Sequence, residues 1–365
     1  MAADLSPELS EVVESFLGQR AWSAEAPDPG SAPPLWAALT TELGLPGLLV
    51  EERYGGQGGA VTDLAAALVQ TGRAGWCGPL VPVAGVAVDL LGRLDPGDGS
   101  GLRARVAAGG IVVPALHERD SGRALETVRT RAEVSGASAV VTGEKVFVEA
   151  GRYAEAFLVT AAAGDGAPVL CAVEREAAGV RVEPMEAVDD ARGYARLVLT
   201  DAAAVPLTGA GAEGEAEGAV RDAWLLGALL VAAESVGVAT RALELSVDYA
   251  RTRRQFGRPV AEFQAVKHKL VEMYAELATA QGALRAAVRE HASGGPGWRF
   301  AASAAKARSS DAVMHVLREA VQVHGGIGFT WEHELSRHFR RAVNNRAAYG
   351  TPVRHRELVA AESGF

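Results

Sequence analysis

The chain has 365 residues, of which 48% are hydrophobic and 22% are charged, enough for two or three folding units with well-filled cores. Its net charge of −9 argues against nucleic acid as a partner, because phosphate binding needs a basic surface. The two cysteines, Cys77 and Cys171, cannot build a disulfide framework and lack metal-ligand spacing. We expect them to be small apolar core residues.

The sequence does not predict a membrane-spanning helix. Such a helix needs a run of about 18 apolar residues, and the richest stretch, residues 225–238, is interrupted by Glu234 and Ser235. The first residues include Asp4 and Glu8, which have the wrong charge for a secretory signal. We therefore expect a soluble cytoplasmic protein without a membrane partner.

The N-terminal part, residues 1–108, has a helical pattern interrupted by glycine and proline. Within it, residues 45–58 read as a turn, a short apolar run and a glycine loop. We predict an N-terminal helical domain.

Residues 109–207 change to a pattern of short strands bounded by glycine, aspartate and serine. Strands without intervening ten-residue helices favour an antiparallel sheet or small barrel over βαβ units. The predicted strands are residues 111–116, 128–134, 139–148, 156–160, 169–173 and 195–199.

Residues 208–219 form a glycine-rich acidic linker. It contains Gly209, Gly211 and Gly214 in the spacing of a dinucleotide-binding loop. The interleaved glutamates, Glu213 among them, would repel a pyrophosphate at a helix N-terminus, so we discount a Rossmann site here.

The C-terminal part, residues 220–365, predicts long antiparallel helices. Apolar residues recur every three or four positions over 225–247 and again over 266–288, and a third helix is expected over 299–323. Thr330 is a predicted N-cap for a fourth helix. The expected architecture is α+β: a helical domain, a central antiparallel β domain and a C-terminal four-helix bundle.

Two stretches in the C-terminal part carry the most information. Residues 249–270 include Arg253, Gln255, Phe256 and Gly257, and residues 322–330 contain Gln322 followed by a glycine pair and a third glycine. Together with the order of domains and the Tyr-Gly-Gly loop within residues 45–58, these stretches resemble acyl-CoA dehydrogenases. The resemblance covers nearly the entire chain.

The resemblance implies FAD as the cofactor and an oligomer as the working form. In this family an arginine three residues before the phenylalanine holds the pyrophosphate of a neighbouring subunit's FAD, and a planar guanidinium suits that role. The second stretch meets the adenosine end of the same cofactor. The implied FAD-binding residues are Arg253, Gln255, Phe256, Gln322, Gly325 and Gly326. The alternative is that Arg251, Arg253 and Arg254 form a solvated charged corner.

The flavin side of the expected site departs from the family. Residues 143–151 resemble the β-domain segment that meets the flavin, but Phe147 replaces a tryptophan and Glu149 stands where a threonine hydroxyl is usual. A carboxylate beside a flavin that becomes anionic on reduction is unfavourable. Residues 116–122 replace another family loop, without a match to it.

The catalytic base is missing from both positions where the family places its glutamate. These positions fall on Tyr349 and Gly227. A phenol with a pKa near 10 is a poor base at neutral pH. Glu234 lies two turns beyond Gly227 and is expected to be a helix residue at an internal contact. The catalytic residues stay unassigned.

The sequence ending from Arg337 onward resembles a subfamily in which some chains work as paired, unlike subunits. The leading function is therefore α,β-desaturation of acyl-CoA or another acyl thioester, by this chain alone or as one subunit of a heteromeric enzyme. Its electrons would pass to an electron-transfer acceptor. The alternatives are a base-less subunit that clamps FAD, and a redox-neutral enzyme on the same fold.

No metal site is expected. His333 and His338 are five residues apart, which separates them by about 140° around a helix, so they cannot share a metal. We expect His324 to be a polar helix or interface residue rather than a catalyst.

Overall fold

The computed structural model describes residues 5–20, 33, 35–76, 78–95, 98–119, 128–164, 166–207 and 215–364. It divides into two compact units. The helical unit is Met1–Ala24, Val61–Cys77 and Ala228–Phe365; the β unit is Glu25–Ala60 and Gly78–Gly227. Helix α6 (Glu215–Thr252) contributes to both. The division of the chain into 1–108, 109–207, 208–219 and 220–365 stays a prediction.

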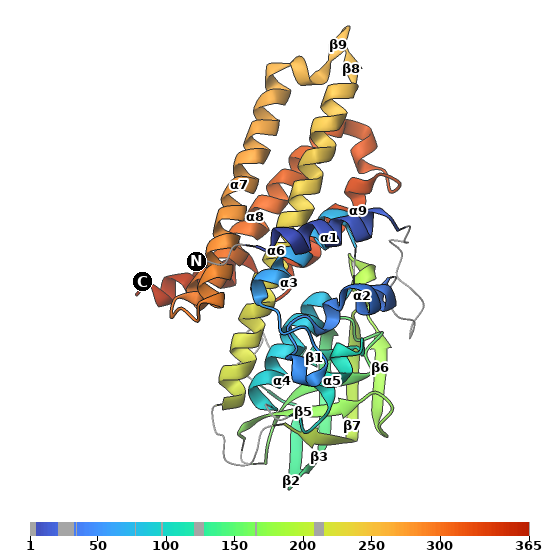
Figure 1. Cartoon of the computed structure of the whole chain (residues 1–365), viewed down its shortest axis with the longest axis vertical. Helices are drawn as coiled ribbons and strands as arrows, with labels where there is room; N and C mark the ends of the chain where they lie inside the picture. The colour runs from blue at the N-terminus through green and yellow to red at the C-terminus, as the bar shows by residue number, and fades with distance from the viewer. Residues whose placement is uncertain are drawn as a thin grey trace. The chain divides into compact units, whose positions relative to one another are not determined.

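Seven strands make up the sheet of the β unit (Figure 1). They are β1 (Val112–Ala115), β2 (Arg131–Ser135), β3 (Ser138–Val148), β4 (Ala156–Ala162), β5 (Pro168–Glu174), β6 (Val180–Pro184) and β7 (Ala195–Pro206). The pairing order is β1-β4-β2-β3-β7-β5, and β5 also pairs with β4, so five strands form a closed ring. The expected antiparallel pairing dominates, but β1 and β4 run parallel.

The extent to which each strand is buried explains why some strands could be predicted from the sequence and others could not. Six of the seven residues of β4 are buried, so it reads as a continuous apolar run. Strand β6, by contrast, has no fully buried residue and was not predicted, because its apolar face is limited to Val180 and Val182. The β unit also contains α2 (Trp36–Leu43), the π-helical turn η3 (Val81–Ala87), α4 (Val88–Leu94) and α5 (Leu102–Ala107).

A buried lysine ties a loop of the β unit to two strands. Lys145 in β3 is fully buried, and its Nζ donates to Glu118 Oε1 at 2.7 Å and to Thr160 Oγ1 at 3.0 Å. Burial lowers the pKa of Lys145 to about 8, although the Glu118 carboxylate acts in the opposite direction. Glu118 also accepts from the backbone amide of Thr130 at 3.0 Å. The loop before β2 is thereby fastened to the sheet. Residues 120–127, which include the end of the unmatched loop, lie outside the described residues.

The helical unit has its longest helices side by side. It contains α1 (Pro7–Gly18), α3 (Val61–Ala74), the end of α6, α7 (Gln264–Ala292), α8 (Trp298–His324), α9 (Glu334–Ala347) and α10 (Pro352–Glu362). A two-stranded hairpin, β8 (Arg254–Gln255) and β9 (Arg258–Pro259), joins α6 to α7. The three long helices of the expected bundle are confirmed. Helix α6 begins at Glu215, inside the predicted linker, and residues 208–214 lie outside the described part of the chain.

The predicted N-cap at Thr330 is wrong. Residues Gly325–Phe329 form the 3₁₀ turn η6, and the Thr330 hydroxyl donates to the Ile327 carbonyl at 3.1 Å. Helix α9 starts four residues later, with His333 as its N-cap; His333 Nδ1 accepts from the Leu335 amide at 3.2 Å.

Helix α6 is a core helix. By length and composition it could cross a membrane, contrary to the sequence expectation, but 94% of its most apolar window is buried inside the protein. Close packing on α3 requires two glycines. A Cβ added to Gly72 would lie 2.2 Å from the Glu234 carbonyl oxygen, and one added to Gly237 would lie 1.9 Å from the Val69 carbonyl oxygen. The two backbones are therefore in direct contact.

A buried ion pair fixes α9 against α6. Glu234 and Arg341 are 2% and 1% exposed, and Arg341 Nη1 donates to Glu234 Oε1 at 2.8 Å. Asn345, one turn further along α9, donates from Nδ2 to Glu234 Oε2 at 2.9 Å. Arg341 Nη1 also donates to the Trp76 carbonyl at 3.0 Å. Both carboxylate oxygens of Glu234 are thus engaged, which supports the expected internal-contact role.

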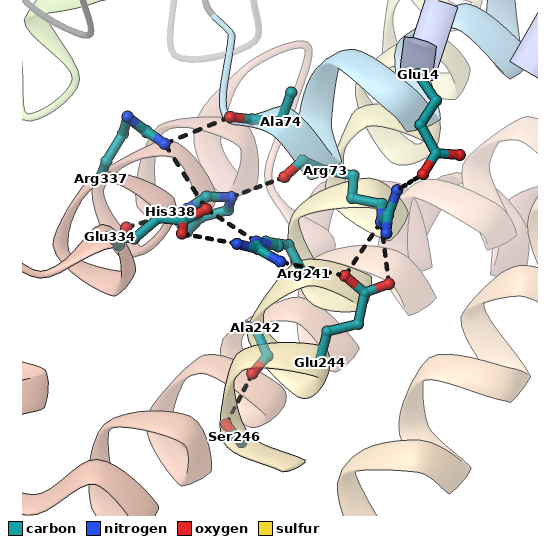
Figure 2. Close-up of polar contacts among 10 residues, drawn as sticks. All are labelled: Glu14, Arg73, Ala74, Arg241, Ala242, Glu244, Ser246, Glu334, Arg337 and His338. Atoms are coloured by element: carbon teal, nitrogen blue, oxygen red, sulfur yellow. Dashed lines mark hydrogen bonds and ion pairs between the residues drawn. The ribbon is translucent and has the colours of Figure 1, made fainter. Parts of the chain in front are cut away.

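A second, partly exposed charge network surrounds this core (Figure 2). Arg73 of α3 donates to Glu244 of α6 at 3.0 Å and also contacts Glu14 of α1. Arg241 of α6 holds Glu334 of α9 through two bonds of 2.9 and 3.0 Å. The charges alternate in sign across four helices, so each arginine lies between carboxylates.

We predict that Arg341→Met destabilises the protein by about 3–5 kcal/mol, because it leaves the Glu234 carboxylate buried without its cation. The double variant Glu234→Gln with Arg341→Met should lose less, since no charge remains. Urea unfolding of the three proteins measures this difference. A double variant at least as unstable as the single one would contradict the assignment.

Candidate functional site

The first group of predicted cofactor residues lies at the tip of the hairpin between α6 and α7 (Figure 1). Arg253 follows the last residue of α6, Gln255 lies in β8 and Phe256 occupies the turn, and all three side chains are exposed. Phe256 is 92% exposed and has φ 50°, a left-handed conformation that is uncommon outside glycine and concentrated at functional sites.

Hydrogen bonds fix the backbone at this tip, whereas those three exposed side chains are not fixed in this way. The Arg253 amide donates to the Tyr249 carbonyl at 2.8 Å, and the Val260 amide donates to the Arg253 carbonyl at 2.8 Å. The Phe256 ring meets the edge of Phe263 at 6.2 Å. Within the residues that the structure describes, no ion pair or side-chain hydrogen bond engages the Arg253 guanidinium. The guanidinium is available to an external anion.

The second group lies where α8 ends. Gln322 is exposed in the last turn of α8, and Gly325 and Gly326 follow the helix and are exposed. Gly325 has φ 64°, a conformation that favours glycine. Neither a Cβ on Gly325 nor one on Gly326 would meet any atom within 4 Å. Internal packing therefore does not require a glycine at 326, whereas close approach of an external group to the backbone would.

Aromatic contacts bring the two groups to one end of the helical unit. Tyr249, in the last turn of α6, stacks on His324, the last residue of α8, with ring centroids 4.5 Å apart and an interplanar angle of 28°. His324 also meets the His333 ring at 4.8 Å. All six predicted cofactor residues thus lie beside the adjoining ends of α6 and α8.

The segment of the β unit that is expected to face the flavin, residues 143–151, has an irregular backbone. The β3–β7 register shifts between Lys145 and Val148, and the bulged residue Phe147 has φ 52° and is 58% exposed. A bulge re-aims a side chain and occurs often next to functional sites. The exposed ring stands at the position that the family gives to its tryptophan.

Glu149 does not project a bare carboxylate from this segment. Its side chain is buried, and Glu149 Oε1 accepts from Arg192 Nη1 at 2.8 Å. The Arg192 side chain is 2% exposed and also lies 3.7 Å from Asp189. The buried arginine offsets the negative charge, which weakens the objection to a flavin beside this strand. Arg192 could not be linked to Glu149 from sequence, because 43 residues separate them.

None of the candidate base positions carries an unpaired carboxylate. Gly227 is buried in α6, and Tyr349 is 8% exposed with φ 51° in the turn between α9 and α10. Glu149 and Glu234 are each paired with a buried arginine. An ion-paired carboxylate is a weak base, because the cation stabilises its charged form.

Two buried nitrogen groups hold the turn around Tyr349. Lys306 Nζ donates to the Asn345 carbonyl at 2.5 Å, near the C-terminal end of α9, where a cation is favourable. Burial lowers the pKa of Lys306 to about 7. His355 is fully buried, and its Nε2 lies 2.7 Å from the Tyr349 carbonyl; because a carbonyl only accepts, Nε2 is the donor. The left-handed turn is therefore built into the fold.

His333 and His338 have different structural roles. His333 caps α9, while the buried ring of His338 lies between two carbonyl oxygens, those of Glu334 at 3.1 Å and Arg73 at 3.2 Å (Figure 2).

The sequence matches the family described as acyl-CoA dehydrogenase, C-terminal domain, over residues 219–364. It is 30% identical over 341 residues to acyl-CoA dehydrogenase IpdE2 of Mycolicibacterium smegmatis, covering 91% of this chain and 89% of that protein. It is 36% identical to FadE34 of Mycobacterium tuberculosis over 85% of this chain, but over only 39% of FadE34.

Solved structures show the same fold. A variant of the Tcur3481–Tcur3483 steroid ACAD superposes with a TM-score of 0.85 at 26% identity, covering 98% of each chain. The ChsE4–ChsE5 complex of Mycobacterium tuberculosis gives a TM-score of 0.85 at 24% identity, covering 100% of this chain and 98% of that one. The predicted fold class is confirmed.

We predict an acid-dependent loss of stability through His355. Burial lowers its pKa from 6.5 to about 4, so the unfolded chain binds this proton first as the pH falls. Its contribution to stability is complete above pH 6.5 and is lost as the pH falls toward 4. Between pH 7 and 5 the loss should be about 2 kcal/mol.

His355→Gln retains a donor for the Tyr349 carbonyl but does not titrate. In urea unfolding it should lose about 2 kcal/mol less than the unaltered protein between pH 7 and 5. An equal loss in both proteins would show that His355 does not have the lowered pKa.

Proposed function

Because the chain belongs to the acyl-CoA dehydrogenase family, we propose that it is one subunit of an FAD-dependent oxidoreductase that desaturates an acyl thioester between Cα and Cβ. Its own part is to clamp the FAD of a neighbouring subunit. The observation that carries this proposal is the unpaired Arg253 guanidinium after α6, together with the open backbone at Gly325 and Gly326 after α8, two helix ends joined by the Tyr249–His324 contact.

The residues at this end of the helical unit fit a dinucleotide such as FAD. The Arg253 guanidinium can hold a pyrophosphate through two parallel hydrogen bonds. Gln255 and Gln322 offer exposed amides for polar groups. Gly325 and Gly326 leave the backbone open to a flat or bulky group, and the exposed Phe256 ring can cover its apolar surface.

Bound FAD supplies the acceptor for a hydride from the thioester. The chain's own contribution is to hold and orient the cofactor, and to exclude water with apolar side chains. In the β unit, Phe147 is placed to pack on a flavin ring, and Arg192 neutralises the nearby Glu149. Arg192 thus removes the repulsion that a bare carboxylate would exert on a reduced flavin.

A neighbouring subunit is part of this proposal. The side chains at the tip are exposed within their own chain, and in the family the corresponding arginine serves the adjacent subunit. Two of the similar solved structures, Tcur3481–Tcur3483 and ChsE4–ChsE5, are each named for two proteins. We therefore favour a heteromeric assembly over a homo-oligomer, in the cytoplasm, with a separate protein or small molecule as electron acceptor.

The absence of a carboxylate at Gly227 and Tyr349 favours the same assembly. Removal of the α proton then depends on a glutamate from the partner. A clamp without catalysis of its own is the second candidate function. A redox-neutral reaction on the same fold has no observation in its favour beyond the missing base. Because a steroid ACAD is among the similar structures, a steroid-derived thioester is a worthwhile test substrate.

We predict that Arg253→Ala lowers FAD occupancy while the fold stays intact, because one lost charge-assisted hydrogen-bonded pair costs about 1.5–3 kcal/mol. Arg253→Lys should recover only part of the affinity, since a point charge cannot bind bidentately. FAD content per chain after purification, read from the visible spectrum, measures both effects.

Arg251→Ala is the matched control, since it removes the same charge from the same exposed helix end. It should leave FAD content nearly unchanged. Unchanged FAD content in Arg253→Ala would support the solvated charged corner instead of a clamp, and equal losses in Arg251→Ala and Arg253→Ala would indicate a general effect of positive charge.

We also predict that the isolated chain reduces its flavin slowly with acyl-CoA. A positioned base contributes about 10²–10⁴-fold, and neither family position provides one here. Tyr349→Glu, or co-expression with a glutamate-bearing homologue, should accelerate anaerobic bleaching. Rapid bleaching by the unaltered chain without a partner would refute the base-less assignment.

A further inference from the structure

The two halves of the proposed clamp come from distant parts of the sequence. Arg253 follows α6, whereas Gln322, Gly325 and Gly326 lie at the end of α8. A bidentate pyrophosphate contact tolerates little displacement, since small shifts from productive geometry cost much of the interaction. Some contact must therefore keep the ends of α6 and α8 at a constant separation.

We propose that the packed rings of Tyr249, His324 and His333 position the two halves of the clamp, and so determine FAD affinity without touching the cofactor. Tyr249 stacks on His324, and the His333 ring meets His324 edge-on. This inference rests on the proposed FAD clamp. The three rings come from the ends of three elements: the last turn of α6, the last residue of α8 and the N-cap of α9. We call them the ring stack.

Both histidines of the ring stack are oriented by a backbone contact. His324 Nδ1 lies 2.8 Å from the Ala320 carbonyl, so this nitrogen carries the proton. His333 Nδ1 accepts from the Leu335 amide at 3.2 Å, so this nitrogen is unprotonated. Burial lowers the pKa of His324 and the neighbouring His333 acts in the same direction, although the hydrogen bond to Ala320 opposes them; the net shift favours the neutral imidazole. A neutral imidazole stacks on a phenol ring without burying a charge.

The ring stack is linked directly to the clamp. The Tyr249 carbonyl accepts from the Arg253 amide at 2.8 Å and from the Thr252 hydroxyl at 3.2 Å. His324 precedes Gly325 in the chain. A shift of either ring therefore moves a clamp residue through one peptide unit or one hydrogen bond.

The ring stack is a positioning device and not a major part of the core. Tyr249 and His333 are only half-buried, and His324 alone is buried. Truncating one ring should therefore leave the chain folded. The stack is also confined to one end of the unit. A similar contact, between His291 and Trp298 at 4.9 Å, lies at the opposite end of α8, roughly 39 Å along the helix at 1.5 Å per residue.

The test measures FAD affinity in the full chain, purified in the assembly in which it forms. FAD is removed and then titrated back, with quenching of flavin fluorescence as the readout. Tyr249→Leu and His324→Leu should each weaken binding about tenfold, the scale of one lost aromatic contact. Tyr249→Phe and His324→Phe retain a stacked ring and should bind within about threefold of the unaltered protein. Trp298→Leu is the control: it should lower the unfolding midpoint but leave FAD affinity unchanged.

A double variant tests the coupling. In the Tyr249→Leu background, Arg253→Ala should weaken FAD binding by a smaller factor than in the unaltered protein, because Arg253 is already misplaced. Equal factors in both backgrounds would overturn the positioning role. So would phenylalanine variants that bind as weakly as the leucine variants, or a Trp298→Leu variant that loses the same affinity.

The Arg253→Ala single variant separates this inference from the proposed function. If it weakens FAD binding while Tyr249→Leu and His324→Leu do not, the ring stack has no positioning role and the clamp stands. If Arg253→Ala itself binds FAD normally, the clamp assignment is wrong and the inference falls with it.

Discussion

The Glu234 carboxylate is a constraint on which much of the helical unit depends. It is 2% exposed and lies in α6, a helix whose most apolar window is 94% buried, so both oxygens must find partners inside the fold. Arg341 and Asn345 provide them from successive turns of α9. Such a pair specifies one rotation and one register of α9 on α6, because any other leaves a buried charge unsatisfied. The glycine contact between α3 and α6 occurs at the same level of the helix.

The same device recurs in the β unit. Lys145 with Glu118 and Arg192 with Glu149 are also buried ion pairs. Each connects β3, or the residue directly after it, to a segment outside the sheet. Buried pairs add little net stability compared with apolar residues of the same size, but breaking one is costly. We interpret them as determinants of geometry: they hold loops and helix ends where the exposed cofactor residues need them.

Sequence reasoning was most successful where a pattern repeats. Apolar spacing revealed α6, α7 and α8, and the Arg253 and Gln322 stretches led to the family that the comparisons then supported. Prediction from the sequence failed where a side chain contacts a residue far away in the sequence, or where a local hydrogen bond replaces the helix cap that the residue type suggests. The Thr330 hydroxyl bonds within η6 instead of capping α9. The sequence criterion passed over α6 because it required an uninterrupted apolar run, whereas the average hydropathy of the window stays high with one glutamate in it. That glutamate, Glu234, is paired inside the fold. The partners of Glu149 and the contact between Tyr249 and His324 could not be predicted from the sequence, because only the fold brings these residues together.

The exposed rings near the clamp have a consequence for the cell. Phe256, Phe329 and Trp331 are 92%, 80% and 71% exposed. Exposed aromatic surface of this kind is bound by chaperones and promotes aggregation. In the assembly proposed above, a chain synthesised in excess of its partner would leave these rings uncovered and be removed by quality control, so that assembly calls for balanced production of its subunits.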